Sequence, residues 1–328
     1  MNPFPKKVLV TGGVGFIGSH IVDTLLLRGC SVSIVDIGER TDTRNEKASY
    51  YHVDISDRAS LEGVFKKEKP EAIIHAGALA RIQPSFKDPE RYFMVNALGT
   101  ANILSLSKKY SVKRVIYSAS SSAYGDQEMP LQEHMAVATQ AYHPYGSTKR
   151  MGEMLMRDMG IATGGPETVC LRYFNVYGPR QTTEADGPYA TVIGIFFEQS
   201  SRNAPLTVVP DGHQRRDFTY VSDVVEANLQ ALVSPHVGRG EIINVGFGNS
   251  NSIWDVVRFV YKLDGSIIPD EMIKKGYATY APERRGEARE TLAHTALAEK
   301  LLGWKPRVSF EEGIERTREF YRKQGWNV

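Results

Sequence analysis

The chain has 328 residues, of which 41% are hydrophobic and 24% are charged, and these ordinary values exclude disordered, collagen-like and coiled-coil proteins. Lys and Arg total 40 against 38 Asp and Glu, so the net charge of +2 gives no electrostatic reason to expect nucleic-acid or membrane-surface binding. The only cysteines, Cys30 and Cys170, are too few for a disulfide framework and fit a reducing compartment. Because no signal peptide and no apolar run of about 18 residues are found, we expect a cytoplasmic protein without a membrane partner.

The first half of the chain alternates short β-branched runs with longer helical patterns. Such alternation predicts an α/β fold in which helices cover both faces of a parallel sheet. The expected strands are Lys7–Thr11, Ser31–Asp36, Ala72–His75, Val112–Ser118 and Thr168–Leu171, and the expected helices are Phe16–Arg28, Leu61–Lys67 and Glu90–Lys109.

The second half is less regular, and we expect it to form a smaller α/β lobe over the carboxyl edge of the sheet. The predicted boundary divides residues 1–175 from residues 176–328, with residues 217–245 returning to the first domain. The returning strands are expected at Phe218–Val221 and Glu241–Val245, long loops at Thr182–Gly187 and Ile267–Glu290, and final helices at Ala293–Leu302 and Phe310–Lys323.

A glycine-rich turn joins the first strand to the first helix. Gly12 allows a tight turn, Gly15 lets the backbone approach a pyrophosphate, and Gly18 lets the helix pack on the strand. The helix N-terminus offers free N–H groups and a partial positive charge to the phosphates. The next strand ends in Asp36, whose carboxylate can bind an adenosine ribose 2′-OH and repels a 2′-phosphate. This pattern predicts a Rossmann-type doubly wound sheet that binds NAD in preference to NADP.

Tyr145 and Lys149 are spaced so that they share one face of a helix. A neighbouring ammonium group stabilises a phenolate and lowers the pKa of the tyrosine, which is otherwise near 10. Such a tyrosine can take the proton of an alcohol while a hydride leaves the same carbon. The serine run Ser118–Ser122 follows a predicted strand, so one of its hydroxyl groups can hydrogen-bond the reacting oxygen.

Together with the segments Leu171–Arg180 and Arg215–Asp223, these motifs resemble an extended short-chain dehydrogenase/reductase. More narrowly, the chain resembles the NAD-dependent epimerase/dehydratase family of nucleotide-sugar enzymes, over nearly its whole length. The resemblance implies NAD as cofactor and Ser120, Tyr145 and Lys149 as catalytic residues. The cofactor-binding residues that it implies are Gly12, Gly15, Phe16, Ile17, Gly18, Asp36, Asp54, Ile55, Ala76, Gly77, Ala78, Asn96, Ser118, Tyr145, Lys149 and Tyr173.

The two residues after Ser120 distinguish reactions within the family that the chain resembles. Dehydratases carry an acid at one of these positions and decarboxylating relatives carry a Glu, whereas this chain has Ser121 and Ser122. The remaining reaction is 4-epimerisation, in which C4 is oxidised, the keto sugar turns over, and its other face is reduced. A dehydratase or reductase on the same scaffold remains an alternative. A non-enzymatic NAD-binding regulator is a third hypothesis, which the presence of Ser120, Tyr145 and Lys149 disfavours.

The resemblance also implies where a nucleotide sugar would bind. Thr291 stands where 4-epimerases can carry a bulky Tyr, so we expect room for a 2-acetamido group. The expected substrates are therefore UDP-N-acetylglucosamine and UDP-N-acetylgalactosamine, with UDP-glucose and UDP-galactose as a second pair. Arg81 leaves a UDP-uronic acid open as a substrate, because its guanidinium group can pair with the carboxylate of such a sugar. The alternative is that Arg81 forms a salt bridge within the protein or a second contact to the diphosphate. The implied substrate residues are Arg81, Ser120, Ser121, Ser122, Asn175, Val192, Arg216, Arg284 and Thr291.

Two helical patterns, Glu90–Lys109 and Tyr145–Asp158, resemble the helices that form a four-helix dimer interface in the family, so we expect a homodimer. The eight histidines show no ligand spacing with acids, so we expect no metal ion.

Overall fold

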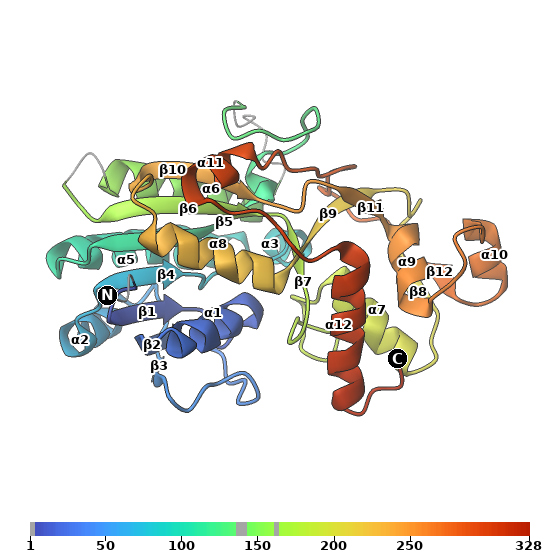
Figure 1. The fold of residues 1–328 in the computed structure, drawn as a ribbon, viewed down its shortest axis with the longest axis horizontal. Helices are drawn as coiled ribbons and strands as arrows, with labels where there is room; N and C mark the ends of the chain where they lie inside the picture. Colours follow the sequence, from blue (N-terminus) through green and yellow to red (C-terminus); the bar gives the residue numbers. More distant parts are fainter. Residues whose placement is uncertain (1–3, 136–142, 161–163) are drawn as a thin grey trace.

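The computed structural model describes residues 4–135, 143–160 and 164–328. Its central sheet has seven strands, all parallel (Figure 1). In spatial order they are β10 (Arg239–Val245), β6 (Glu167–Tyr173), β5 (Arg114–Ser120), β4 (Ala72–His75), β1 (Lys7–Thr11), β2 (Ser31–Asp36) and β3 (Ser49–His52). The chain runs outward from β1 through β2 to β3 and then returns to β4 on the other side of β1. This reversal opens a crevice at the carboxyl ends of β1 and β4, where ligands bind in such sheets.

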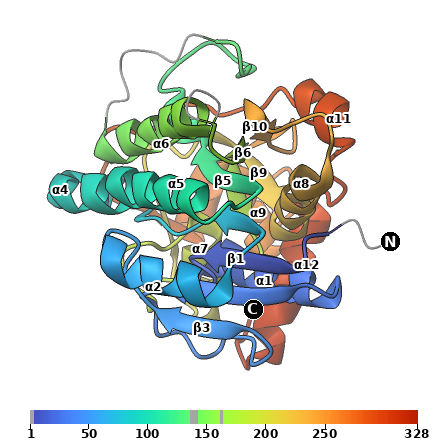
Figure 2. The ribbon, with the colours of Figure 1, turned by 90° about the vertical axis from the view of Figure 1, so that its left-hand side faces the viewer.

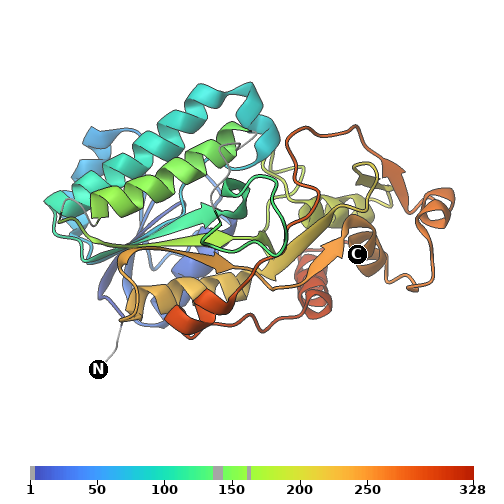
Figure 3. The same cartoon turned by 90° about the horizontal axis from the view of Figure 1, so that it is seen from above.

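Helices cover both faces of the sheet, as Figures 2 and 3 show from two sides. The helices on one face are α1 (Phe16–Leu27), α8 (Val221–Val233) and α11 (Ala296–Leu302), and those on the other are α2 (Arg58–Glu68), α5 (Gly99–Lys109) and α6 (Pro144–Gly160).

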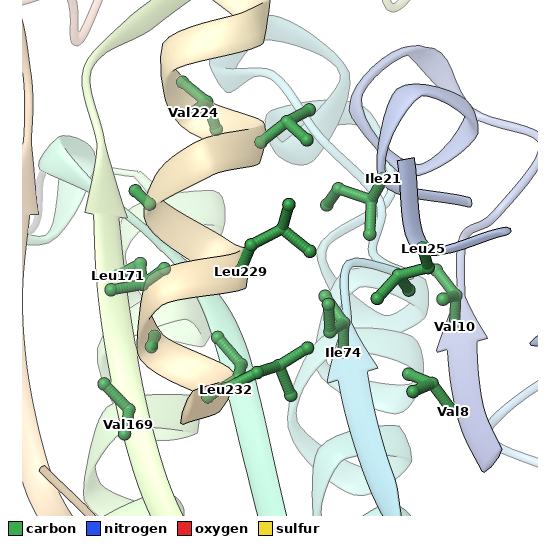
Figure 4. Close-up of a cluster of buried hydrophobic side chains, with 14 of the residues drawn as sticks. Val8, Val10, Ile21, Leu25, Ile74, Val169, Leu171, Val224, Leu229 and Leu232 are labelled. Carbon is green, nitrogen blue, oxygen red and sulfur yellow. The ribbon is translucent and has the colours of Figure 1, made fainter. Parts of the chain in front are cut away.

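Side chains alternate along β1 between two cores. Val8 and Val10 pack towards α1 and α8, whereas Leu9 packs towards the helices of the opposite face. Figure 4 shows the first core, in which Leu229 and Leu232 of α8 lie over the sheet beside Ile21 and Leu25 of α1. Both faces of the strand are therefore buried, which explains why it reads as a continuous apolar run.

The expected fold class is confirmed, and β1, β2, β4 and the last helix have the predicted bounds. The edge strand β3 was not predicted, and β5 begins and ends two residues later than expected. The helix expected over Glu90–Lys109 is divided into three segments. They are α4 (Pro89–Tyr92), the π-helix η1 (Phe93–Leu98) and α5.

The C-terminal lobe has a core of its own, in which Trp254, Phe310 and Tyr321 are buried. Its two sheets join β11 (Ser250–Ser252), β9 (Arg215–Tyr220) and β7 (Asn175–Tyr177), and β12 (Ala278–Tyr280) and β8 (Leu206–Val208). Its helices are α7 (Val192–Ser201), α9 (Ile253–Tyr261), α10 (Pro269–Lys274) and α12 (Phe310–Lys323).

Two expectations for the second half need correction. Glu241–Val245 lies in β10 and joins the central sheet beside β6, as predicted, but Phe218–Val221 does not. Its strand, β9, pairs with β7 and β11 in the lobe, because β10 already occupies the edge next to β6. The segment Ile267–Glu290 is not one loop, since it contains α10 and β12.

None of the helices in the described ranges is long and apolar enough to cross a lipid bilayer.

Candidate active site

A cavity of about 1100 Å³ lies between the carboxyl edge of the central sheet and the C-terminal lobe. Residues from both halves of the chain line it, from Gly12 at the end of β1 to Thr291 in the lobe. Every residue predicted to bind cofactor or substrate lines this cavity except Asn96. The structure therefore brings together groups that are almost the whole chain apart in sequence.

The glycine-rich turn forms the floor for a phosphate group. Gly12 has a φ of +70°, and a Cβ atom there would lie 2.7 Å from the backbone nitrogen of Gly77. A Cβ atom at Gly18 would lie 2.0 Å from the carbonyl oxygen of Gly12, so both positions require glycine. Gly15 is the N-cap of α1 and contributes no side-chain cap, and the first turn carries no acidic residue. The N-terminus of α1 thus suits the pyrophosphate of NAD.

Asp36 ends β2 at the wall of the cavity. Its two carboxylate oxygens accept hydrogen bonds from the backbone nitrogens of Val14 at 3.0 Å and Gly38 at 2.8 Å. Two nearby cations are engaged elsewhere, since Arg40 pairs with Asp42 and Arg44 stacks over the ring of Tyr50. An anionic carboxylate held at this place fits a ribose hydroxyl and opposes a 2′-phosphate.

Ser120 is the last residue of β5, Tyr145 lies in the first turn of α6, and both residues line the cavity. Burial raises the pKa of Tyr145, while the neighbouring Ser120 hydroxyl and the positive charge of Arg81 lower it. Lys149, which we expected to supply such a charge, donates from its ammonium group to the carbonyl oxygen of Ser118, 2.8 Å away. Burial lowers the pKa of Lys149 to about 8. Arg81 is a cation acting on Tyr145 that we had not predicted for this role.

His143, which sequence reasoning did not assign to the site, begins the helix that carries Tyr145. Its Nδ1 accepts a hydrogen bond from the backbone nitrogen of Gly146 at 2.9 Å, so the ring caps α6. Burial lowers the pKa of His143 to about 4 and keeps the ring neutral. The ring stacks on Tyr145 with centroids 6.2 Å apart, and the edge of Tyr92 meets Tyr145 at 6.3 Å. The sequence feature that could have indicated His143 as a site residue is its position immediately before Pro144 and Tyr145.

Asn96 supports the wall of the cavity from behind. Its side chain donates to the carbonyl oxygen of Leu79 at 2.9 Å and accepts from the Leu79 backbone nitrogen at 2.8 Å. It also donates to the hydroxyl of Thr148 in α6 at 3.0 Å. Asn96 therefore joins the loop after β4 to α6 and is not among the residues that line the cavity.

The hydroxyl of Thr291 is used by the lobe itself. It accepts hydrogen bonds from Asn175 Nδ2 at 3.1 Å and from the backbone nitrogen of Asp217 at 3.2 Å. Burial raises the pKa of Asp217 to about 6, and its carboxylate accepts from Phe247, Gly248 and Ala293 backbone nitrogens. These contacts hold Asn175 and Thr291 at fixed places on the cavity wall.

Three arginines bring positive charge to the cavity from different elements. Arg216 and Arg284 both face Glu287, with nitrogen to oxygen distances of 3.5 Å and 3.8 Å. Arg81 comes from the loop after β4 and donates from Nε to the carbonyl oxygen of Tyr189 at 3.0 Å. Several cations on the wall of one cavity suit an anionic ligand such as a diphosphate.

Within the described ranges, no group of three or more His, Cys, Asp or Glu side chains is placed to hold a metal ion.

The fold and this site define a Rossmann-type short-chain dehydrogenase/reductase. Residues 8–246 match the NAD dependent epimerase/dehydratase family, and the chain belongs to that family. The UDP-glucuronate 4-epimerase of Thermodesulfobacterium geofontis is 32% identical over 322 residues, covering 94% of each chain. The UDP-glucose 4-epimerase of Thermotoga maritima, solved with UDP-glucose, has a TM-score of 0.87 and 34% identity, and the match covers 97% of this chain and 99% of that chain. The UDP-N-acetylglucosamine 4-epimerase of Methanobrevibacter ruminantium has a TM-score of 0.83 and 31% identity, and the match covers 98% of this chain and 99% of that chain.

The predictions of the family, of an enzyme and of NAD as its cofactor are confirmed. The comparisons support an enzyme of the UDP-sugar 4-epimerase type, but the three relatives differ in the sugar that their names give.

Proposed function

We propose that the protein interconverts UDP-sugars that differ in configuration at C4. The observation that carries this proposal is the pair Ser120 and Tyr145, which line the cavity together, with serines and not acids at the two positions after Ser120. The pair can remove and return the proton of a sugar hydroxyl. Dehydration and decarboxylation would need an acid–base carboxylate that Ser121 and Ser122 cannot supply.

In this reaction the residues of the chain handle the proton and hold the sugar. When bound, NAD would supply the hydride acceptor for C4 and the hydride for the reduction of the opposite face. Tyr145, as phenolate, takes the proton of the C4 hydroxyl, and Ser120 binds the same oxygen. Lys149 and Arg81 stabilise the phenolate by their charge, because the low dielectric of the site strengthens such interactions. The 4-keto sugar then turns about its link to the diphosphate, and Tyr145 returns the proton.

We propose that residues 1–175 serve the cofactor and that residues 176–328 serve the sugar nucleotide. Arg216 and Arg284 bind the diphosphate, with Asn175 at its end. Both arginines face Glu287 in the structure, so a diphosphate would replace or share this carboxylate partner. Because both distances to Glu287 are long for an ion pair, the exchange costs little.

For the sugar, we propose N-acetylated hexoses, with UDP-glucose and UDP-galactose as a second pair. Thr291 lines the cavity with a small side chain whose hydroxyl is occupied by Asn175 and Asp217. A Tyr at this position would fill the space that a 2-acetamido group needs.

A UDP-uronic acid is the second candidate, and Arg81 favours it. Its guanidinium group lies on the cavity wall near Tyr145, and among the described residues its hydrogen-bond partner is the backbone carbonyl of Tyr189. A sugar carboxylate could therefore pair with it at the reacting end of the site.

A panel of UDP-sugars tests the reaction and the choice of sugar together. The enzyme is incubated with NAD and, separately, with UDP-N-acetylglucosamine, UDP-glucose and UDP-glucuronic acid, and the products are followed by NMR. We expect the 4-epimer of the N-acetylated sugar to form fastest. Fastest conversion of UDP-glucuronic acid would establish the second candidate, and no 4-epimer from any sugar would contradict the proposal.

We also propose a homodimer that forms through η1, α5 and α6. Apolar side chains on these elements are exposed, including Met94 at 48% and Met154 at 49%. Leu98 and Met151 are exposed beside them on the same two elements, and α5 packs along α6. A second copy of the chain would cover these side chains in a four-helix bundle. Both cysteines are free and buried, in agreement with our proposal that the enzyme works in the reducing cytoplasm.

A further inference from the structure

A buried ion pair lies directly behind the catalytic groups. Glu153 of α6 and Arg172 of β6 make two parallel hydrogen bonds of 2.7 Å each, Nε to Oε1 and Nη2 to Oε2. Their side chains are 3% and 0% exposed. The ring of Tyr124 covers the guanidinium group, and Arg172 Cζ lies 4.2 Å from the centre of that ring. The pair is therefore held in one geometry.

Such a pair is a weak device for stability alone. Taking two charges out of water costs several kcal/mol per ion, and well-packed apolar residues often do as well or better. Stability alone therefore does not explain a bidentate pair that is fully enclosed between α6 and β6, and the pair is expected to have a second role. The place of Glu153 on α6 suggests one, because it lies one helical turn after Lys149 on the same face.

Lys149 is itself 4% exposed, and its neighbours carry little negative charge. Its ammonium group donates to the carbonyl oxygen of Ser118 and lies 5.0 Å from the centre of the Tyr117 ring. His75 of β4 is neutral, because burial and then the charge of Lys149 lower its pKa to about 3. Tyr145 is a phenol whose pKa is raised by burial, Arg81 is a cation that acts on Tyr145, and Arg172 is a cation that lies beyond Glu153. Glu153 is therefore the carboxylate that faces Lys149.

We propose that Glu153, held in place by Arg172, is the counter-ion that keeps Lys149 protonated in the working enzyme. Glu153 touches neither substrate nor cofactor, so it is a positioning residue that acts through Lys149. Arg172 fixes the position of the carboxylate.

The electrostatics of the site agree with this role. Burial lowers the pKa of Lys149 to about 8, and the charge of Glu153 opposes that fall. Without the carboxylate, burial would act alone and the ammonium group would lose its proton closer to neutral pH. If Lys149 assists Tyr145 as in the proposed function, on which this consequence rests, activity would then fall at a lower pH than in the unaltered enzyme.

The variant Glu153→Gln tests the proposal, since it keeps the size of the side chain and removes its charge. The protein is labelled with ¹³C at the lysine Cε, and the Lys149 resonance is assigned by its loss in Lys149→Met. We expect the titration midpoint of Lys149 to fall by about one unit or more in Glu153→Gln. The matched control is Glu198→Gln, because Glu198 is also buried, at 2% exposure, and ion-paired, with Arg202 of the same helical region. The midpoint should not move in the control.

A purely structural pair would give a different result. Glu153→Gln would then lower the unfolding temperature, as Glu198→Gln does, and leave the Lys149 midpoint unchanged, which would overturn the proposal. If Glu153→Gln does not fold because Arg172 is left unpaired, Glu153→Gln/Arg172→Gln removes both charges. A smaller fall is then expected, because losing the more distant Arg172 charge partly offsets losing the carboxylate. An unchanged midpoint in that variant would also overturn the proposal. The titration needs no substrate, so its outcome is separate from that of the UDP-sugar panel.

Discussion

Lys149 donates a hydrogen bond from Nζ to the carbonyl oxygen of Ser118 at 2.8 Å. The bond ties α6, which carries Tyr145, to the strand that ends in Ser120. The two hydroxyl groups proposed to handle the C4 proton are thus fixed by one buried contact between their elements. The predictions below test the groups around this contact.

Tyr145→Phe removes the hydroxyl that takes the proton of the sugar. We expect the turnover number to fall by roughly 100- to 10,000-fold, the usual contribution of a general base. Bound NAD should remain, because the glycine turn is untouched. The control is Tyr280→Phe, a tyrosine that is 50% exposed and outside the cavity. Near-normal turnover in Tyr145→Phe would refute the assigned role.

Arg81→Gln removes the positive charge that lowers the pKa of Tyr145. The pKa of the tyrosine should rise, and because the phenolate is the active form, the rising limb of the pH–rate profile should move to higher pH. Arg285→Gln is the control, since Arg285 does not line the cavity. An unshifted limb in Arg81→Gln would show that another group controls the ionisation of Tyr145.

Thr291→Tyr should narrow the sugar pocket. We expect kcat/KM to fall by roughly 10- to 200-fold for UDP-N-acetylglucosamine and to change less for UDP-glucose. Thr291→Val is the matched control, because it keeps the size of the side chain and loses only the hydroxyl that Asn175 and Asp217 use. Equal losses for both sugars in Thr291→Tyr would mean that Thr291 does not meet the 2-substituent.

His143 links stability to pH through its neutral ring. Its pKa is lowered from 6.5 to about 4 by burial, so the folded protein binds fewer protons than the unfolded chain between these values. The stability that the neutral ring contributes is therefore present above about pH 6.5 and is lost as the pH falls through 4. We expect Asn in His143→Asn to keep the cap of α6. The unfolding temperature of this variant should fall less between pH 7 and pH 5 than that of the unaltered protein. His143→Ala should cost about 1 kcal/mol at pH 7. Identical pH dependence in His143→Asn would place the effect at another group, such as His75.

Met154→Asp tests the proposed dimer. A carboxylate in the middle of the apolar surface on α6 should convert the protein to monomers, measured by light scattering after gel filtration. Leu27→Asp is the control, because Leu27 is 86% exposed at the end of α1, on the opposite face of the sheet. Monomers in both variants, or dimers in both, would contradict the assigned interface.

The parts of the fold that could be predicted are those that local physics determines. The close approach of Gly12 to Gly77 and of Gly18 to Gly12 requires glycine, and that requirement is visible as a spacing in the sequence. The spacing of Tyr145 and Lys149 likewise follows from the helical repeat. Asp36 was found because it ends the next strand after the glycine turn and its helix.

The parts that escaped prediction depend on partners that are distant in the chain. The residues of β9 have a strand pattern, but nothing in that pattern says whether β6 or β7 will be the neighbour. Arg81 acts on Tyr145 from a loop that precedes it by many residues, so the spacing of Tyr145 and Lys149 gave no sign of this second cation. The pairing of Glu153 with Arg172 joins a helix to a strand and leaves no local signal.

The central claim is that one hydride leaves C4 and returns to C4. It is tested most directly by UDP-N-acetylglucosamine that carries deuterium at C4, or by the correspondingly labelled form of whichever UDP-sugar proves the best substrate. The account predicts that the 4-epimer retains the deuterium at C4, that no solvent hydrogen enters there, and that no free NADH accumulates. Loss of the deuterium to solvent, or steady accumulation of NADH, would contradict it.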